Sequence, residues 1–163
     1  MTAAVTHPTV ASARVAPVLA GAARVALGVL WLHEGIVKYR AGFGAADIGF
    51  VVDGAAGDPR VPAPFAAVVE TLLGAAPGLF GALMPLLEVL LGALLVAGVL
   101  TRVAACVSVV TLMTYWLADL LVAQYPVMVL LSVVVLLFPA AAAAGSLPSL
   151  RTVVASRRRA RAQ

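Results

Sequence analysis

Four apolar runs of roughly 20 residues each dominate this sequence and constrain its fold more than any other feature. They cover about residues 17–39, 79–100, 103–122 and 127–144. The chain has 63% hydrophobic and 11% charged residues and a mean hydropathy of +1.09, values far from those of soluble globular domains. Because about 20 apolar residues in a helix cross a bilayer, the sequence predicts an all-α integral membrane protein, a four-helix bundle over residues 17–145.

The connections after the second and third runs are short. Thr101 and Arg102 make a tight connection, and the residues AQYP at 123–126 form another turn. Pro139 is expected to kink or shorten the fourth helix, because proline removes a backbone donor and clashes with the preceding turn.

The segment 41–77 is different in composition from the runs on either side. It collects glycines, prolines and acidic residues, which are typical of a solvent-exposed loop. Within it, FAAVVETLLG at Phe65–Gly74 has the length of an interfacial or re-entrant helix and is too short to cross a bilayer. We therefore expect one short interfacial helix in this loop.

Basic residues indicate how the bundle is oriented. With four spans, one side carries Arg14, Arg24, Arg102, Arg151 and the arginines of the tail 146–163. Since lysine and arginine favour the cytoplasmic side, we expect both termini, including the tail 1–16, to be cytoplasmic and the loop 41–77 to face outward. The basic tail suits anionic lipid headgroups, and we expect no nucleic-acid partner.

The chain has few residues that bind redox cofactors or metals. Cys106 is the single cysteine, so the chain has no internal disulfide and no CxxC pair, and no haem, flavin or cluster motif is visible. His33 and His7 are the two histidines, so a metal site would depend on carboxylates. We expect no metal.

Ionisable residues inside apolar runs are costly and therefore mark functional candidates. Glu34 and Lys38 are spaced i, i+4, with the acid on the N-terminal side, which favours a helical ion pair. The alternative is that they only neutralise one another near the interface, or that Lys38 extends to water. Glu88 lies within the second run and needs a partner or a proton, and its alternative role is a structural hydrogen bond between helices.

The third run carries polar residues with helical spacing. Ser108, Thr111, Tyr115 and Asp119 follow i, i+3, i+7 and i+11, which places them on one face of a helix. Tyr115 and the adjacent Trp116 are alternatively interface anchors. Under the inferred topology Glu34, Lys38, Tyr115 and Asp119 fall in the outer half with Glu88 just below them, so we expect one polar pocket that opens outward, with the loop 41–77 as its lid or as a docking surface.

The runs RVALGVLWLHEGIVKY, from Arg24, and LLEVLLGALLVAGVLTRVAA, from Leu86, resemble the DoxX family of small four-span bacterial membrane proteins. The matching residues are Arg24, Leu27, Gly28, Gly35, Lys38, Glu88, Gly92, Gly98, Thr101 and Arg102. The resemblance implies a multi-pass protein of the bacterial inner membrane, related to the DoxD-type subunit of thiosulfate:quinone oxidoreductases. The chain departs from the family in its longer first outer loop and in lacking a cysteine pair, which argues against direct sulfur chemistry.

The first functional hypothesis is a subunit of a quinone-linked redox system, whose electrons come from a partner protein. Glu34 and Glu88 would carry protons, with Lys38 as their counter-ion, because quinone reduction takes up protons together with electrons. The residues expected to contact the quinone headgroup are His33, Tyr115, Trp116 and Asp119.

Two other classes of function stay open. The chain is alternatively a non-catalytic subunit that anchors or stabilises a larger membrane complex, such as a respiratory complex, or a homo-oligomer. A small proton-coupled transporter built around Glu88 is the third class, although four spans contain no visible inverted repeat.

Overall fold

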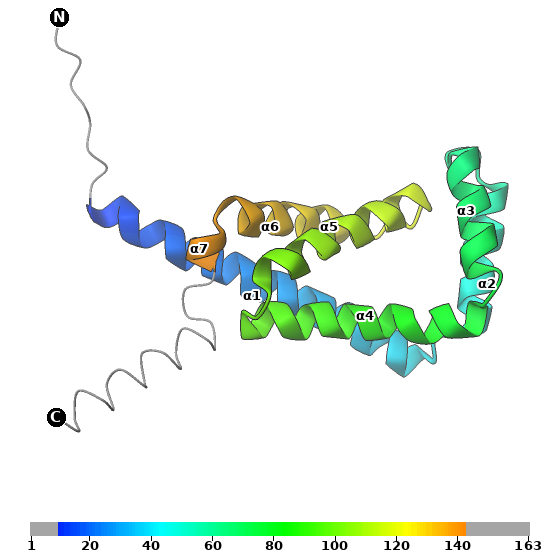
Figure 1. Ribbon diagram of the computed structural model, residues 1–163, viewed down its shortest axis with the longest axis horizontal. Coiled ribbons are helices and arrows are strands. Elements are labelled where there is room, and N and C mark those ends of the chain that lie inside the picture. The colour runs from blue at the N-terminus through cyan, green and yellow to red at the C-terminus, as the bar shows by residue number, and fades with distance from the viewer. Residues whose placement is uncertain (1–9, 143–163) are drawn as a thin grey trace, which may run out of the picture.

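The computed structural model describes residues 10–142, and this part of the chain is helical throughout, without a β-strand (Figure 1). Its helices are α1 (Val10–Ala41), α2 (Ala45–Gly57), α3 (Ala63–Leu73), α4 (Pro77–Ala97), α5 (Thr101–Leu117), α6 (Tyr125–Leu137) and α7 (Pro139–Ala142). The all-α prediction is confirmed for these residues. The outer parts of both tails, with His7 and the basic segment 146–163, lie outside them.

α1, α4, α5 and α6 form the bundle and are its four long helices. They run alternately in opposite directions (Figure 1). α1 and α4 lie side by side and make the most extensive helix contact, while α5 packs against α6, and α6 and α7 pack against α1. The α2–α3 hairpin (residues 45–73) stands across one end of the bundle, and α7 lies toward the other (Figure 1). Large side chains fill the interior, among them Trp31, Leu27, Leu95, Leu112 and Met128.

Three glycines bring the backbones of α1 and α4 into direct contact. A methyl group added at Gly28 would lie 2.9 Å from the carbonyl oxygen of Gly92, and one at Gly92 would lie 2.7 Å from that of Gly28. A methyl group at Gly35 would lie 2.9 Å from the carbonyl oxygen of Pro85. Hydrogen is therefore the largest substituent that fits at these positions, and the small residues allow the close helix approach that is typical of packing in lipid.

The C-terminal end of α4 is closed by an arginine from another helix. Gly98 has a left-handed φ of 71° and ends α4. Arg24, which is 4% exposed, donates hydrogen bonds from its Nη1 atom to the carbonyl oxygens of Leu95 (2.5 Å) and Val96 (3.0 Å). A cation at a helix C-terminus satisfies unpaired carbonyl groups and interacts favourably with the helix dipole. Arg24 therefore binds the end of α4, and it is not the cation that faces Glu88.

The segment 41–77 contains two helices where the sequence analysis expected one. α3 corresponds to the predicted short helix, whereas α2 covers residues that were predicted to form a loop because of their glycines and acids. α2 forms because the Asp47 carboxylate accepts a hydrogen bond from the backbone N–H of Gly44 at 2.8 Å, and because Ile48 and Ala55 are buried.

The ends of the last two long helices also differ from the predicted boundaries. α5 ends at Leu117 and not at residue 122, since Asp119 adopts a left-handed φ of 56° and stops the helix. Asp119 therefore leaves the helical face that Ser108, Thr111 and Tyr115 share. The predicted break at Pro139 is confirmed, because α6 ends at Leu137 and Pro139 begins α7.

Within residues 10–142, two helical segments are long and apolar enough to cross a membrane, Pro17–Ala41 and Pro77–Ala97. The helices α5 and α6, with 17 and 13 residues, are apolar but shorter than the roughly 20 residues that a full crossing needs. The four-span topology and the cytoplasmic position of both termini stay predictions.

The glycine contact leads to a first testable prediction. The substitution Gly92→Ala places a methyl group against backbone atoms of α1, and we expect it to lower the free energy of unfolding by about 1–3 kcal/mol. Thermal unfolding in detergent, followed by circular dichroism, measures the effect.

The matched control is Gly78→Ala in the same helix, where no described atom lies within 4 Å of an added methyl group. This variant should be as stable as the wild type or slightly more stable, because alanine favours helix over glycine. Equal melting temperatures for both variants would contradict a close backbone contact at Gly92.

Candidate functional site

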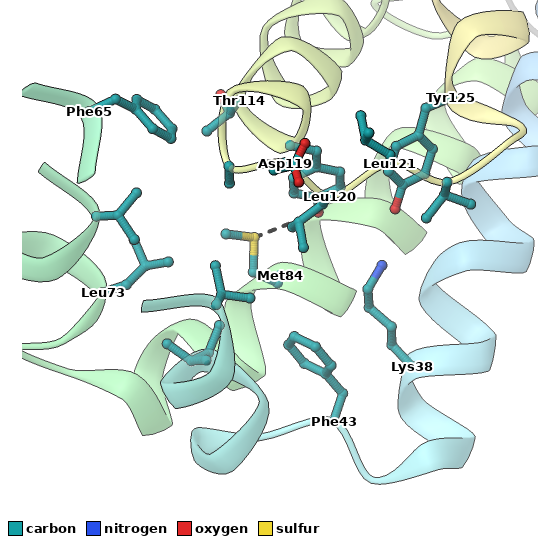
Figure 2. A pocket seen from close by; sticks show the side chains of 16 residues that line it. Lys38, Phe43, Phe65, Leu73, Met84, Thr114, Asp119, Leu120, Leu121 and Tyr125 are labelled. Atoms are coloured by element: carbon teal, nitrogen blue, oxygen red, sulfur yellow. Dashed lines mark hydrogen bonds between the residues drawn. The ribbon is translucent and has the colours of Figure 1, made fainter. Parts of the chain in front are cut away.

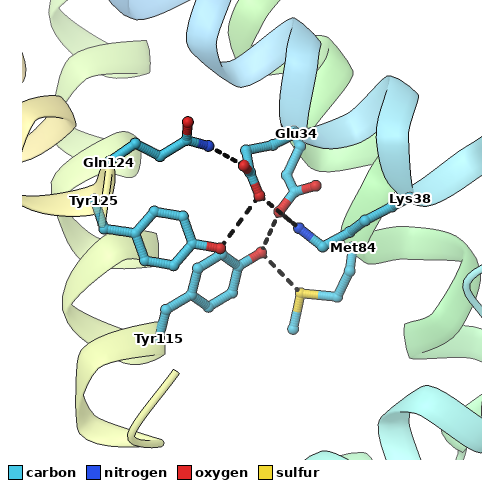
Figure 3. Close-up of polar contacts among 7 residues, drawn as sticks. Glu34, Lys38, Met84, Tyr115, Gln124 and Tyr125 are labelled. Atoms are coloured by element: carbon cyan, nitrogen blue, oxygen red, sulfur yellow. Dashed lines mark hydrogen bonds and ion pairs between the residues drawn. The ribbon is translucent and has the colours of Figure 1, made fainter. Parts of the chain in front are cut away.

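Six side chains from four helices and one connection form a hydrogen-bonded group near the end of the bundle that carries the α2–α3 hairpin (Figure 3). We call it the polar cluster, and its members are Glu34, Lys38, Glu88, Tyr115, Gln124 and Tyr125. α1 supplies Glu34 and Lys38, α4 supplies Glu88, and α5 supplies Tyr115. Gln124 and Tyr125 come from the connection to α6 and from its first residue.

Lys38 lies between the two carboxylates of the cluster. Its Nζ atom is 3.2 Å from Oε2 of Glu34 and 2.6 Å from Oε1 of Glu88. The Glu88 side chain is fully buried, and that of Lys38 is 19% exposed. A buried carboxylate requires a cation or a proton, so Lys38 is the group that allows Glu88 to lie inside the bundle.

Both tyrosines donate hydrogen bonds to these carboxylates. The Tyr115 hydroxyl donates to Oε1 of Glu88 at 2.7 Å, and the Tyr125 hydroxyl donates to Oε2 of Glu34 at 3.3 Å. Gln124 donates to Oε1 of Glu34. Within the described part of the chain, Oε2 of Glu88 is buried without a hydrogen-bond partner. Each oxygen of Glu34 is therefore satisfied, whereas Glu88 keeps one oxygen on which a proton can reside.

A pocket of about 390 Å³ borders the polar cluster (Figure 2). Lys38, Tyr115 and Tyr125 line it on the side of the cluster, while its other walls are mostly apolar. The apolar walls come from the connection between α1 and α2, from the helices α2, α3 and α4, and from the end of α5. They include Phe43, Ile48, Phe65, Val69, Leu73 and Met84. The pocket combines an apolar interior with a few convergent polar groups, which is typical of small-molecule sites.

An ion pair joins the two sides of this pocket. Arg60, in the turn between α2 and α3, pairs with Asp119, which lines the pocket at the end of α5. Arg60 also pairs with Asp58 at 3.2 Å. The backbone N–H and the guanidinium of Arg60 donate hydrogen bonds to the Asp58 carboxyl and lower its pKa. Both carboxylates thus share one cation.

A second set of polar contacts lies deeper in the bundle and is fully buried. Trp31 donates from Nε1 to Oγ of Ser108 at 2.7 Å, and the hydroxyls of Ser108 and Ser132 are 2.9 Å apart. Ser132 donates to the carbonyl oxygen of Met128. These bonds join α1, α5 and α6 and satisfy one another, which is the behaviour of structural interhelical hydrogen bonds.

The structure brings together four of the residues that the sequence analysis selected, namely Glu34, Lys38, Glu88 and Tyr115. Asp119 lines the same pocket but is paired with Arg60. His33 is exposed on α1, and Trp116, the neighbour of the buried Tyr115 on α5, is 63% exposed. His33 and Trp116 are not among the residues that line this pocket.

Three further residues belong to the site and were missed by sequence reasoning. Gln124 and Tyr125 were interpreted as a turn, and Arg60 as part of an exposed loop. For Gln124 and Tyr125 a signal existed. When successive helices of a bundle run in opposite directions, the connection after α5 lies at the same end as the C-terminal part of α1, which carries Glu34. Nothing in the sequence pairs Arg60 with Asp119, since 59 positions separate them.

Within residues 10–142, no group of three or more histidine, cysteine, aspartate or glutamate side chains is arranged to hold a metal ion. The carboxylates of the polar cluster instead bind a lysine, two tyrosines and a glutamine. The donors that surround them suit proton exchange and hydrogen bonding to an organic ligand.

Comparison with protein-family models, curated proteins and solved structures finds no match for this chain. The resemblance to the DoxX family therefore rests on the residues quoted from the sequence. The function has to be argued from the site itself.

The position of Lys38 leads to a second prediction. The substitution Lys38→Met leaves Glu34 and Glu88 without their shared cation, and we expect it to lower the free energy of unfolding by about 3 kcal/mol. The matched control is Arg40→Met, because Arg40 is exposed on the same helix two residues further on. Unfolding in detergent measures both variants.

The double variant Lys38→Met with Glu88→Gln should recover part of the lost stability, since it removes a buried charge together with its counter-ion. If Lys38→Met and Arg40→Met are equally stable, Lys38 does not stabilise the cluster.

Proposed function

We propose that this protein is a four-span, DoxX-like subunit of the bacterial inner membrane, in which the pocket takes the headgroup of a quinone. A partner protein supplies the electrons, and the polar cluster supplies protons. The observation that carries the proposal is the placement of an apolar pocket directly against Lys38, Tyr115 and Tyr125.

The membrane part of the proposal is supported by the outward faces of the helices. Large apolar side chains are exposed on all four long helices, among them Val29, Leu90, Val110 and Leu130. Such a surface suits lipid and not water. α5 and α6 are short, with 17 and 13 residues, and a bilayer accommodates short spans by local thinning.

The pocket has the chemistry that a quinone headgroup requires. A quinone ring is apolar on its faces and carries carbonyl oxygens that accept hydrogen bonds. The Lys38 ammonium has three N–H donors, and two of them go to Glu34 and Glu88. The third is free to donate to a ligand oxygen, while the apolar walls contact the ring.

The polar cluster can store and move a proton. With both carboxylates ionised, Glu34, Glu88 and Lys38 together carry one net negative charge, which is unfavourable inside an apolar bundle. One proton on Glu88 neutralises the cluster. From Glu88 the hydrogen bond to Tyr115 leads to the pocket, because Tyr115 lines it. Reduction of a quinone to a hydroquinone takes up two electrons and two protons, so Glu88 and Tyr115 would hold and deliver protons at the point of use.

A second candidate function is supported by the same bonds. The polar cluster joins α1, α4, α5 and α6, and nearly all its polar atoms are satisfied internally. A cluster of this kind also suits an accessory subunit that anchors a larger complex, in which the buried charges only hold the helices together.

The two functions predict different behaviour of Tyr115→Phe and Glu88→Gln. Each variant would be purified from native membranes in mild detergent, with mass spectrometry of bound quinone and of partner proteins in the same sample. For the redox function we expect normal assembly and a rate of quinone reduction about 100-fold lower, because a positioned proton donor contributes a factor of that order.

For the accessory function we expect a lower yield of the complex and an unchanged rate per complex. The matched control is Tyr39→Phe, which removes the hydroxyl of an exposed tyrosine on α1. If both cluster variants retain quinone, rate and yield at the level of Tyr39→Phe, neither role of the cluster is correct.

A further inference from the structure

We infer that α3 is a lid over the pocket and that the ion pair of Arg60 with Asp119 is its latch. The use of this lid for ligand entry rests on the proposed function, whereas the opening of α3 does not.

α3 is attached to the bundle through α2. In the described part of the chain, α2 packs against α4, and α3 packs against α2, with no comparably extensive contact between α3 and another helix. The hairpin has its own small core, formed by Ala55, Val61 and Val69. α3 also stands apart from α5 and α6 (Figure 1). An element with few contacts to the rest of a protein opens at low free energy.

The apolar side of α3 forms a wall of the pocket. Phe65 and Leu73 line it (Figure 2). Val69 also lines it and is only 4% exposed. Thr114 and Ala118 line the same pocket from α5. Movement of α3 away from the end of α5 would therefore open the pocket without disturbing the contact between α1 and α4.

The latch, the ion pair of Arg60 with Asp119, connects the α2–α3 hairpin to the end of α5. Among the hydrogen bonds and ion pairs of residues 10–142, the pair of Arg60 with Asp119 is the one that joins the α2–α3 hairpin to the α5–α6 connection. Asp119 has a left-handed φ of 56°, a conformation that non-glycine residues rarely adopt. Arg60 is 67% exposed, so the pair lies in contact with solvent and is sensitive to salt.

The two ends of the hairpin differ in how firmly they are held. At the start of α2, Gly44 lies directly against Gly81 of α4. A methyl group added at Gly81 would lie 2.5 Å from a backbone atom of Gly44. After α3, the connection Gly74-Ala75-Ala76 has no side chain larger than a methyl group. α2 is thus fixed at its base, whereas α3 is held through its packing on α2 and is followed by a connection without large side chains.

Thiol labelling tests the lid without any ligand. Val69→Cys is introduced together with Cys106→Ala, which removes the exposed native thiol, and the rate of reaction with a maleimide is measured in lipid nanodiscs. We expect Arg60→Gln and Asp119→Asn each to raise this rate about two- to fivefold, the range expected for loss of an exposed ion pair. The two substitutions together should act no more strongly than either alone.

Two controls separate opening of the lid from general loosening. Asp53→Asn changes an exposed charge on α2 outside the latch and should leave the rate unchanged. A cysteine introduced at the fully buried Val135 should react with the maleimide no faster in the latch variants than in the protein with Arg60 and Asp119 intact. High salt should accelerate labelling of Val69→Cys in the intact protein and have less effect in the latch variants.

Unchanged labelling in both latch variants overturns the lid. Binding of a short-chain ubiquinone analogue to the same nanodiscs tests the proposed function separately. Faster labelling in the latch variants without quinone binding supports the lid and overturns the quinone site. Quinone binding with unchanged labelling supports the quinone site and overturns the lid.

Discussion

The contact between the backbones of α1 and α4 is the constraint on which the rest of the structure depends. At Gly28, Gly35 and Gly92 the two helices approach so closely that a single methyl group would meet backbone atoms. This separation is also what allows Lys38 on α1 to reach Glu88 on α4 at 2.6 Å, since both lie within one turn of the contact between Gly35 and α4. The packing of the helices and the charges of the site are therefore set by the same interface.

The buried charges are balanced by groups from every other long helix. Lys38 bridges two carboxylates, and Tyr115, Tyr125 and Gln124 satisfy most of the remaining oxygens. The cost of placing carboxylates inside an apolar bundle is offset only where all these donors converge. This convergence joins α5 and α6 to the α1–α4 pair at the end of the bundle that carries the hairpin. Three of these residues, Lys38, Tyr115 and Tyr125, also line the pocket, so the stabilising network and the candidate binding site share them.

The hairpin of α2 and α3 adds the feature that a bare four-helix bundle lacks. Without it, the apolar wall formed by Phe65, Val69 and Leu73 would be missing, and the polar cluster would open directly to its surroundings. α2 is held by Gly44 against α4, whereas α3 is joined to the α5–α6 end through Arg60. A firmly held base beside a weakly attached wall is an arrangement that encloses a pocket and still permits exchange.

The sequence by itself determined the helical class, the apolar runs and the identity of the charged residues that matter most. Apolar patterning and spacing are local properties, and the i, i+4 pair of Glu34 and Lys38 is visible without a structure. The break at Pro139 follows from the chemistry of one residue. The sequence did not reveal α2, since its glycines and acids favour a loop until Asp47 caps the helix and Ile48 is buried.

Only the tertiary structure decided which polar groups meet. Arg24 and Lys38 are both cations of α1, and the packing of α1 on α4 assigns Arg24 to the end of α4 and Lys38 to the cluster. Tyr125 and Arg60 acquire their partners across 91 and 59 positions of sequence. The physical reason is that a side chain's partners depend on how far apart the helix axes lie and how the helices are rotated, and these quantities arise from contacts between residues that no local pattern connects.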